Sequence, residues 1–183
     1  MAKIVLSAEP LVDGPTALRP WRDSDLEAIV EACQDPEIVR WTRVPEPYGQ
    51  VDARAYLMQR YELTHAGATA PFAIVSAENL EHLLGSISLM RPSWEHARAE
   101  VGYWLAREAR GQGHATRALR LITAFGFQSL GLERIDLLAA TGNPGSQRVA
   151  ERGGFTREAV LRSYMGGKDG QLDAVAFGLI AAD

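Results

Sequence analysis

The chain has 183 residues, with 19 Lys and Arg against 23 Asp and Glu, so its formal net charge at pH 7 is −4. This balance argues against a general nucleic-acid binder, because such a protein needs clustered cations to neutralise phosphates. A hydrophobic content of 46% is ample for one core, so we expect a single domain over 1–183 with its core at about 15–181.

The expected elements change character about halfway along the chain. They are a hairpin over 11–19, helices over 23–34, 38–43 and 51–65, strands over 72–76, 83–90 and 97–105, a helix over 114–130, a strand over 134–141, a helix over 145–152, and strands over 155–164 and 172–180. The first strands form a meander, whereas later helices and strands alternate as crossover units do. We therefore predict an α/β (mixed α+β) fold, with a mostly antiparallel sheet of six to seven strands flanked by about four helices. In the helix over 51–65, Ala55, Leu57, Met58 and Tyr61 are expected to be buried.

A strand, a glycine turn and a helix follow one another between Glu100 and Leu130. Apolar residues on the helix recur at three- and four-residue spacing, from Ala115 to Phe125. Before them stands Arg110-Gly111-Gln112-Gly113-His114-Ala115. Glycine lets an anion approach the main chain, and the first N–H groups of a helix lack internal acceptors. The turn therefore predicts a phosphate-binding loop.

Residue content separates three classes of phosphate loop. A nucleoside-triphosphate loop needs Lys followed by Ser or Thr after its last glycine, and His114-Ala115 stands there instead. A dinucleotide loop, as in an NAD-dependent dehydrogenase, needs glycine or alanine where Thr116 stands, although Glu133 lies near the separation of a ribose partner. Residues 110–115 resemble the Arg-x-x-Gly-x-Ala loop that binds the acyl-CoA pyrophosphate in the GNAT superfamily of N-acyltransferases.

A second motif lies at the separation that this superfamily shows. Asn143-Pro144-Gly145-Ser146, a short helix and Gly154-Phe155 resemble the signature of the RimJ/RimL branch, whose members acetylate protein N-termini. Ala17 to Trp21 and Asp23 to Leu26 look like the first strand and opening helix of that branch. The resemblance covers nearly the whole chain. It implies a GNAT-like fold and the transfer of an acetyl group from acetyl-CoA to a primary amine, by direct attack in a ternary complex.

The resemblance also implies catalytic roles. Glu100 stands where the branch often carries an acidic residue, and is the candidate general base, acting through a water or with its pKa raised by burial. Its alternatives are a solvated strand residue or an ion pair with a neighbour such as Arg98 or Arg107. The superfamily's tyrosine, seven residues after the asparagine, is Ala150 here. Ser146 stands where the RimJ/RimL branch carries its serine, so the resemblance makes it the candidate that hydrogen-bonds the leaving thiolate or protonates it, unless it merely caps the helix.

The cofactor is expected to contact two groups of residues. Backbone N–H groups near Tyr103, Trp104 and Leu105 are candidates to stabilise the oxyanion. Asn143 is expected to hold the pantetheine arm, or simply to cap the helix before Pro144. The predicted acetyl-CoA contacts are Tyr103, Trp104, Leu105, Arg110, Gly111, Gln112, Gly113, His114, Ala115, Thr116 and Asn143. The tyrosine missing at Ala150 also leaves open a non-catalytic acyl-CoA sensor or interaction module.

Partners and compartment complete the predictions. The acceptor is a protein N-terminus or a small-molecule amine, and Trp41, Arg43 and Trp94 are candidates to line its groove. The four histidines show no metal-ligand spacing, so no metal is expected. No apolar run approaches the ~20 residues of a membrane helix, there is no secretory signal, and Cys33 has no disulfide partner, so the expected compartment is the cytoplasm. A homodimer is expected.

Overall fold

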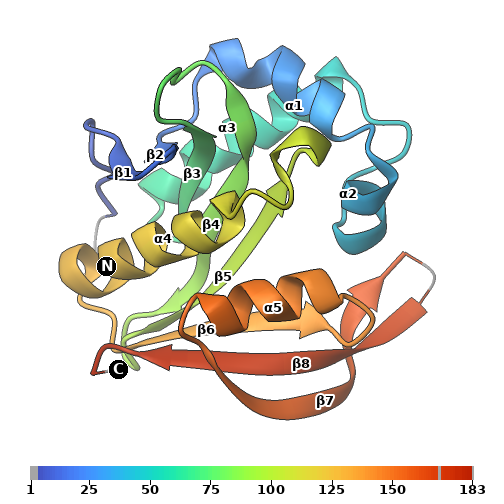
Figure 1. The fold of residues 1–183 in the computed structure, drawn as a ribbon. Coiled ribbons are helices and arrows are strands. Elements are labelled where there is room, and N and C mark those ends of the chain that lie inside the picture. The colour runs from blue at the N-terminus through green and yellow to red at the C-terminus, as the bar shows by residue number, and fades with distance from the viewer. Residues whose placement is uncertain (1–3, 169, 183) are drawn as a thin grey trace.

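The computed structural model describes residues 4–168 and 170–182, and its strands form one mixed sheet (Figure 1). The strand order is β1-β2-β3-β4-β5-β6-β8-β7, and only the neighbours β5 and β6 are parallel. The strands are β1 Leu11–Asp13, β2 Thr16–Arg19, β3 Thr69–Ser76, β4 Leu83–Ser93, β5 Arg98–Leu105, β6 Arg134–Ala140, β7 Thr156–Gly167 and β8 Gly170–Ile180. The predicted fold class is confirmed. The sheet has eight strands because the amino-terminal hairpin adds β1 as well as β2.

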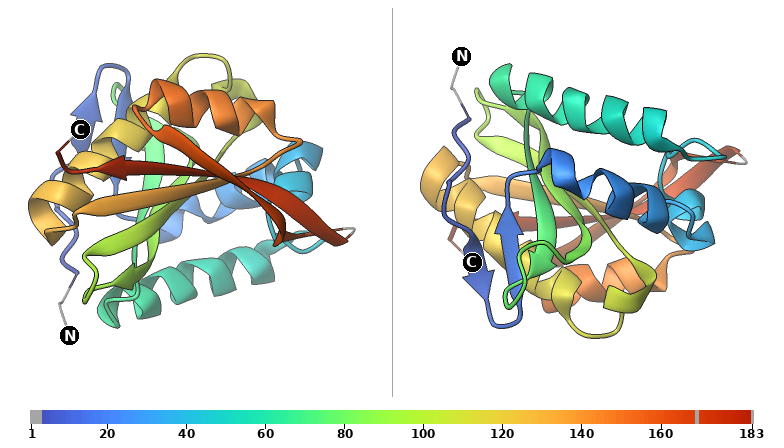
Figure 2. Two further views of the ribbon diagram at one scale, coloured as in Figure 1. Left: turned by 90° about the horizontal axis from the view of Figure 1, so that it is seen from below. Right: turned by 90° about the horizontal axis from the view of Figure 1, so that it is seen from above.

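Helices cover both faces of the sheet (Figure 2). They are the 3-10 helices η1 Asp23–Asp25 and η2 Arg107–Ala109, and the α-helices α1 Leu26–Ala32, α2 Pro36–Trp41, α3 Gln50–His65, α4 His114–Leu130 and α5 Pro144–Arg152. Helices α4 and α5 lie on one face, and α1 and α3 lie on the other. In the described residues, no helix has the length and apolar character that crossing a bilayer requires.

The apolar stripe of α4 packs where its spacing predicts. Leu119 and Ile122 are fully buried, and the ring of Phe125 packs edge-on against Phe72 of β3, with ring centroids 5.3 Å apart. Burying such side chains contributes about 1.5–3 kcal/mol each. The stripe therefore fixes α4 on the sheet, and with it the glycine turn at its head.

The buried face of α3 differs from the prediction. Ala53 and Leu57 are buried, whereas Ala55 is exposed and Met58 and Tyr61 are 63% and 48% exposed. The apolar residues of α3 are spread around the helix, so their spacing did not select one face. Ala53, with no exposed surface, lets α3 approach the sheet closely.

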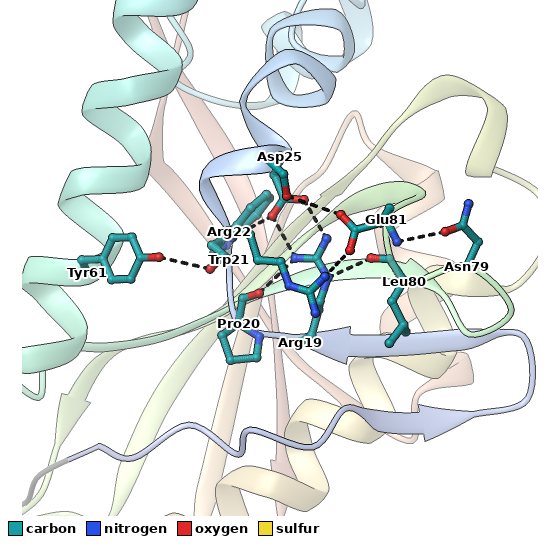
Figure 3. A network of polar contacts seen from close by, with 10 residues as sticks. Arg19, Pro20, Trp21, Arg22, Asp25, Tyr61, Asn79, Leu80 and Glu81 are labelled. Atoms are coloured by element: carbon teal, nitrogen blue, oxygen red, sulfur yellow. Dashed lines mark hydrogen bonds and ion pairs between the residues drawn. The ribbon is translucent and has the colours of Figure 1, made fainter.

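A buried ion pair ties the end of β2 to the first helices (Figure 3). Arg19 donates from both terminal nitrogens to the Asp25 carboxylate, at 2.8 and 2.7 Å, and the two side chains are 1% and 2% exposed. The Nε of Arg19 also donates to the Leu80 carbonyl, in the turn between β3 and β4, at 2.8 Å. These bonds anchor the chain just before α1 begins.

Candidate active site

Strands β5 and β6 separate in the middle of the sheet. They pair only from Arg98 with Arg134 to Val101 with Leu137. Beyond these pairs β5 stays with β4, and β6 stays with β8, so the two strands diverge (Figure 1). Helix α4 begins soon after β5 ends, and α5 begins soon after β6 ends. The first turns of both helices therefore lie at the wide end of this opening.

The main chain of β5 offers hydrogen-bond donors to the opening. Ala106 N–H donates to the Leu84 carbonyl of the β4 side at 2.9 Å. Main-chain groups alternate sides along a strand. The groups of Trp104 therefore face β4, and those of Tyr103 and Leu105 face the opening. Of the three predicted donors, two face the opening.

Strand β4 approaches β5 unusually closely at the same point. A Cβ atom on Gly85 would lie 2.2 Å from the Trp104 carbonyl oxygen, so no side chain fits there. The Trp104 carbonyl and the Leu105 N–H belong to one planar trans peptide and point in opposite directions. Because the Trp104 carbonyl points toward β4, the Leu105 N–H points toward the opening.

The predicted phosphate loop has the expected backbone form. Gly111 and Gly113 have φ of 77° and 82°, a left-handed conformation that favours glycine. Gly113 is the residue that precedes α4. The N–H groups of His114, Ala115 and Thr116 open the helix and have no hydrogen-bond acceptor among the described residues. This set of free donors, at the positive end of a helix, suits an anion.

Two side chains of the loop point away from such an anion. The Arg110 guanidinium donates to the Leu105 carbonyl at 3.2 and 2.9 Å, and pairs with Asp35 at 3.2 Å. The His114 ring is buried, and its Nδ1 lies 2.8 Å from Thr16 Oγ1. Burial, and then the charges of Arg117 and His82, hold the pKa of His114 below its ordinary value. In this structure these residues shape the loop with their side chains, so a phosphate would meet main chain there.

Asp35 organises the turn between β5 and α4 from outside it. Its carboxylate accepts from the Glu37 N–H at 2.8 Å and also pairs with Arg107 and Arg110. Burial acts to raise its pKa, but the Glu37 N–H and the two arginines outweigh burial and lower it. Asp35 was not among the predicted residues. It also caps α2, through the bond from the Glu37 N–H.

The serine motif lies across the opening from β5. Asn143 caps α5, because its Oδ1 accepts from the Ser146 N–H at 3.0 Å. The Ser146 hydroxyl is therefore free of capping and lies 3.0 Å from the Tyr103 hydroxyl. Burial raises the pKa of Tyr103 to about 12, and the bond to Ser146 acts in the opposite direction. The Tyr103 side chain is a contact that the sequence reasoning missed, since it assigned that residue only main-chain donors.

Glu100 lies on β5 three residues before Tyr103, with its side chain 22% exposed. Its ion-pair partner is Arg91, and not Arg98 or Arg107. The sheet register explains this choice, because Met90, the neighbour of Arg91, lies directly opposite Glu100. A partly exposed carboxylate can exchange protons with water.

The candidate acceptor residues fall into two places. The Trp41 ring would lie 3.5 Å from a Cβ atom on Gly142, so it borders the loop that leads to Asn143. Arg43 lines a pocket of about 360 Å³ together with Val39, Thr42, Val44, Gly166, Gly167 and Lys168. Trp94 is half-buried against the core in the turn before β5, at the opposite end of that strand from the glycine turn. Trp94 is thus not brought together with the other predicted residues.

No cluster of three potential metal ligands occurs within residues 4–168 and 170–182.

Comparisons with known proteins agree with this geometry. The family described as acetyltransferase (GNAT) domain matches residues 16–156. The uncharacterized N-acetyltransferase YoaA of Bacillus subtilis is 28% identical over 148 residues, which are 81% of this chain and 83% of that protein.

Two solved structures share the fold. The ribosomal L7/L12 alpha-N-protein acetyltransferase RimL in complex with coenzyme A has a TM-score of 0.84 and 19% identity, covering 94% of this chain and 98% of that one. Spermidine N-acetyltransferase from Vibrio cholerae with CoA and spermine has a TM-score of 0.78 and 24% identity, covering 93% and 98%. The chain belongs to the GNAT acetyltransferase family.

Proposed function

We propose that this protein moves the acetyl group of acetyl-CoA to a primary amine by direct attack within a ternary complex. One observation carries the proposal. The free N–H groups at the head of α4, the main-chain donors of Tyr103 and Leu105, and the Ser146 hydroxyl all border one opening between β5 and β6. Their order suits the pyrophosphate, thioester carbonyl and sulfur of one extended cofactor.

Each chemical step has a group to serve it. Glu100 accepts a proton from the ammonium form of the acceptor through a water, and the neutral amine attacks the thioester carbon. The N–H of Leu105 or Tyr103 donates to the oxyanion, a contribution worth about 2.7–4 kcal/mol in comparable sites. As the C–S bond breaks, the electron pair goes to sulfur, and Ser146 donates a hydrogen bond to that thiolate. The proton lost by the attacking nitrogen completes the thiol.

Of the two kinds of acceptor, a protein N-terminus fits the charge of the pocket better than a polyamine does. Arg43 and Lys168 both line the pocket between α2 and the β7–β8 turn, and only Lys168 has an ion-pair partner, Glu46, among the described residues. A polyamine brings several positive charges, which Arg43 would repel. A peptide brings carbonyl groups and acidic side chains that a guanidinium binds well.

A thiol-trapping assay tests this function. The protein is incubated with acetyl-CoA and a panel of N-terminal peptides, polyamines and aminoglycosides, and free CoA is measured. Amine-dependent thiol release, strongest with peptides that carry an acidic residue near the N-terminus, is expected. Arg43→Ala should reduce that preference, and the exposed Arg162→Ala on β7 serves as its control. Tight CoA binding without thiol release across the panel would favour the non-catalytic acyl-CoA sensor.

The oligomeric state is a separate proposal. Strand β7 is an edge strand with Val160 and Tyr164 48% and 58% exposed, a surface that suits a second copy in a homodimer. Gel filtration of the full chain should give a species of twice 20.0 kDa. A 20.0 kDa species alone would contradict it.

A further inference from the structure

One hydrogen bond spans the opening between β5 and α5. The Tyr103 hydroxyl, on β5, lies 3.0 Å from the Ser146 hydroxyl, in the first turn of α5. Neither hydroxyl makes another hydrogen bond within the described part of the chain. The family's tyrosine position on α5 is occupied by Ala150, which is fully buried in the core. The phenol beside Ser146 therefore comes from the sheet instead.

The acidities of the two hydroxyls favour Tyr103 as the donor. A phenol is a stronger acid than an alkyl hydroxyl, so Tyr103 is the better donor and Ser146 Oγ the acceptor. The Ser146 backbone is held by the Asn143 cap, so its hydroxyl needs no partner within the helix. With Oγ accepting from the phenol, the serine proton must point elsewhere, and the space left to it is the opening.

We propose that Tyr103 is a positioning residue, whose phenol holds Ser146 so that the serine O–H points at the cofactor sulfur and donates to the developing thiolate. The role rests on the proposed function. Neither hydroxyl gives up its proton: the C–S electron pair goes to sulfur, and both O–H bonds stay intact.

The pKa of Tyr103 distinguishes a positioning role from donation of its proton to the thiolate. Burial raises the pKa of Tyr103 to about 12, whereas a thiol has a pKa near ~8.5. Transfer of the phenol proton to the thiolate would thus be unfavourable by a factor of roughly 10³. A phenol that stays protonated throughout the working pH range is instead a constant hydrogen-bond donor.

The test is the acidity of bound CoA, which needs no acceptor. CoA affinity is first measured by calorimetry. The ultraviolet absorbance of the thiolate is then followed against pH, with the desulfo-CoA complex as the reference. The proteins are the parent, Tyr103→Phe, Ser146→Ala, the double variant, and Tyr61→Phe as a control with a half-exposed phenol on α3, on the other face of the sheet. Phenylalanine keeps the ring of Tyr103 packed on the core, so folding should be preserved.

The expected results are specific to a Tyr103 phenol that acts on the thiolate only through Ser146. Ser146→Ala should raise the pKa of the bound thiol by about 1–2, since a hydrogen bond to a charged group is lost. Tyr103→Phe should raise it by roughly half as much, and the double variant should match Ser146→Ala. With an active acceptor, Tyr103→Phe should lower kcat about 3–10-fold at unchanged KM for acetyl-CoA.

Two outcomes overturn the proposal while leaving acetyl transfer intact. One is an unchanged thiol pKa in Tyr103→Phe. The other is a further rise when Tyr103→Phe is added to Ser146→Ala, which would mean that the phenol contacts sulfur directly. A parent that binds CoA and shows the expected titrations, but transfers no acetyl group, would instead refute the proposed function and leave the pair in place. Absence of CoA binding by the parent would refute both.

Discussion

Replacing Gly113 by valine should abolish cofactor binding while the fold survives. The residue has φ of 82° and precedes three free N–H groups at the head of α4. A Cβ atom there would meet only the far end of the Arg117 side chain, at 2.8 Å, which can move. The stability cost is therefore mainly that of a left-handed side chain, about 1–2 kcal/mol, with about 1 kcal/mol more if Arg117 loses its bond to the Gln112 carbonyl.

The expected loss of CoA affinity is much larger than that structural cost. If the branched side chain excludes two charge-assisted hydrogen bonds to phosphate, roughly 3–6 kcal/mol is lost, or about 10²–10⁴ in Kd. Gly131 offers a matched control, because it ends the same helix with φ of 65° and an added Cβ would meet nothing within 4 Å. Gly131→Val should show a similar fall in Tm with unchanged CoA affinity.

Calorimetry of CoA binding, with circular dichroism and thermal melts, compares the two variants. If Gly113→Val binds CoA as well as the parent and keeps a normal spectrum, the pyrophosphate does not lie at this turn. If Gly131→Val loses binding equally, strain in α4 explains the loss, and contact with phosphate does not.

Three further changes test other parts of the structure. Asp25→Asn should cost about 3–5 kcal/mol, because it leaves the Arg19 guanidinium buried without its counter-charge, whereas Glu81→Gln at the exposed pair nearby should cost under about 1 kcal/mol in urea unfolding. Asp35→Asn should lower Tm at pH 7. Because the folded pKa of Asp35 is lowered, its contribution is present above its unfolded pKa of about 3.9 and lost as pH falls through the folded value, so the variant's Tm should depend less on pH between about 5 and 3. Gly85→Ala should lower both stability and kcat, since its Cβ displaces a carbonyl of β5, and unchanged kinetics would contradict the direction assigned to the neighbouring donor.

Local patterns were sufficient to predict the parts of the site that are made of main chain. The glycines of the turn and the apolar spacing of α4 both act over a few residues, and the structure has the left-handed Gly113 directly before the helix. The cap at Asn143, which was the alternative to its expected contact with the pantetheine arm, is equally local, and the structure shows it. Such features depend on backbone geometry, which neighbouring residues determine.

Side-chain partners far apart in sequence could not be predicted in the same way. Arg110 was expected to reach phosphate, but its direction depends on Asp35, which only the folded chain brings near. The partner of Glu100 depends on the register between β4 and β5, which places Arg91 beside it. The contact between Tyr103 and Ser146 likewise requires β5 and α5 to meet across the opening. No pattern within any one segment carries that information.

The close approach of β4 at Gly85 has a consequence for engineering this enzyme. The proposed oxyanion donor at Leu105 is an amide of the main chain, so no substitution at that residue other than proline removes it. The close packing of β4 at Gly85 limits how far the peptide between Trp104 and Leu105 can tilt, and so determines the direction of this N–H. Glycine at position 85 is therefore a requirement for the geometry of a donor on the neighbouring strand, and a library that varies position 85 is expected to lose activity without any change in the residues that line the opening.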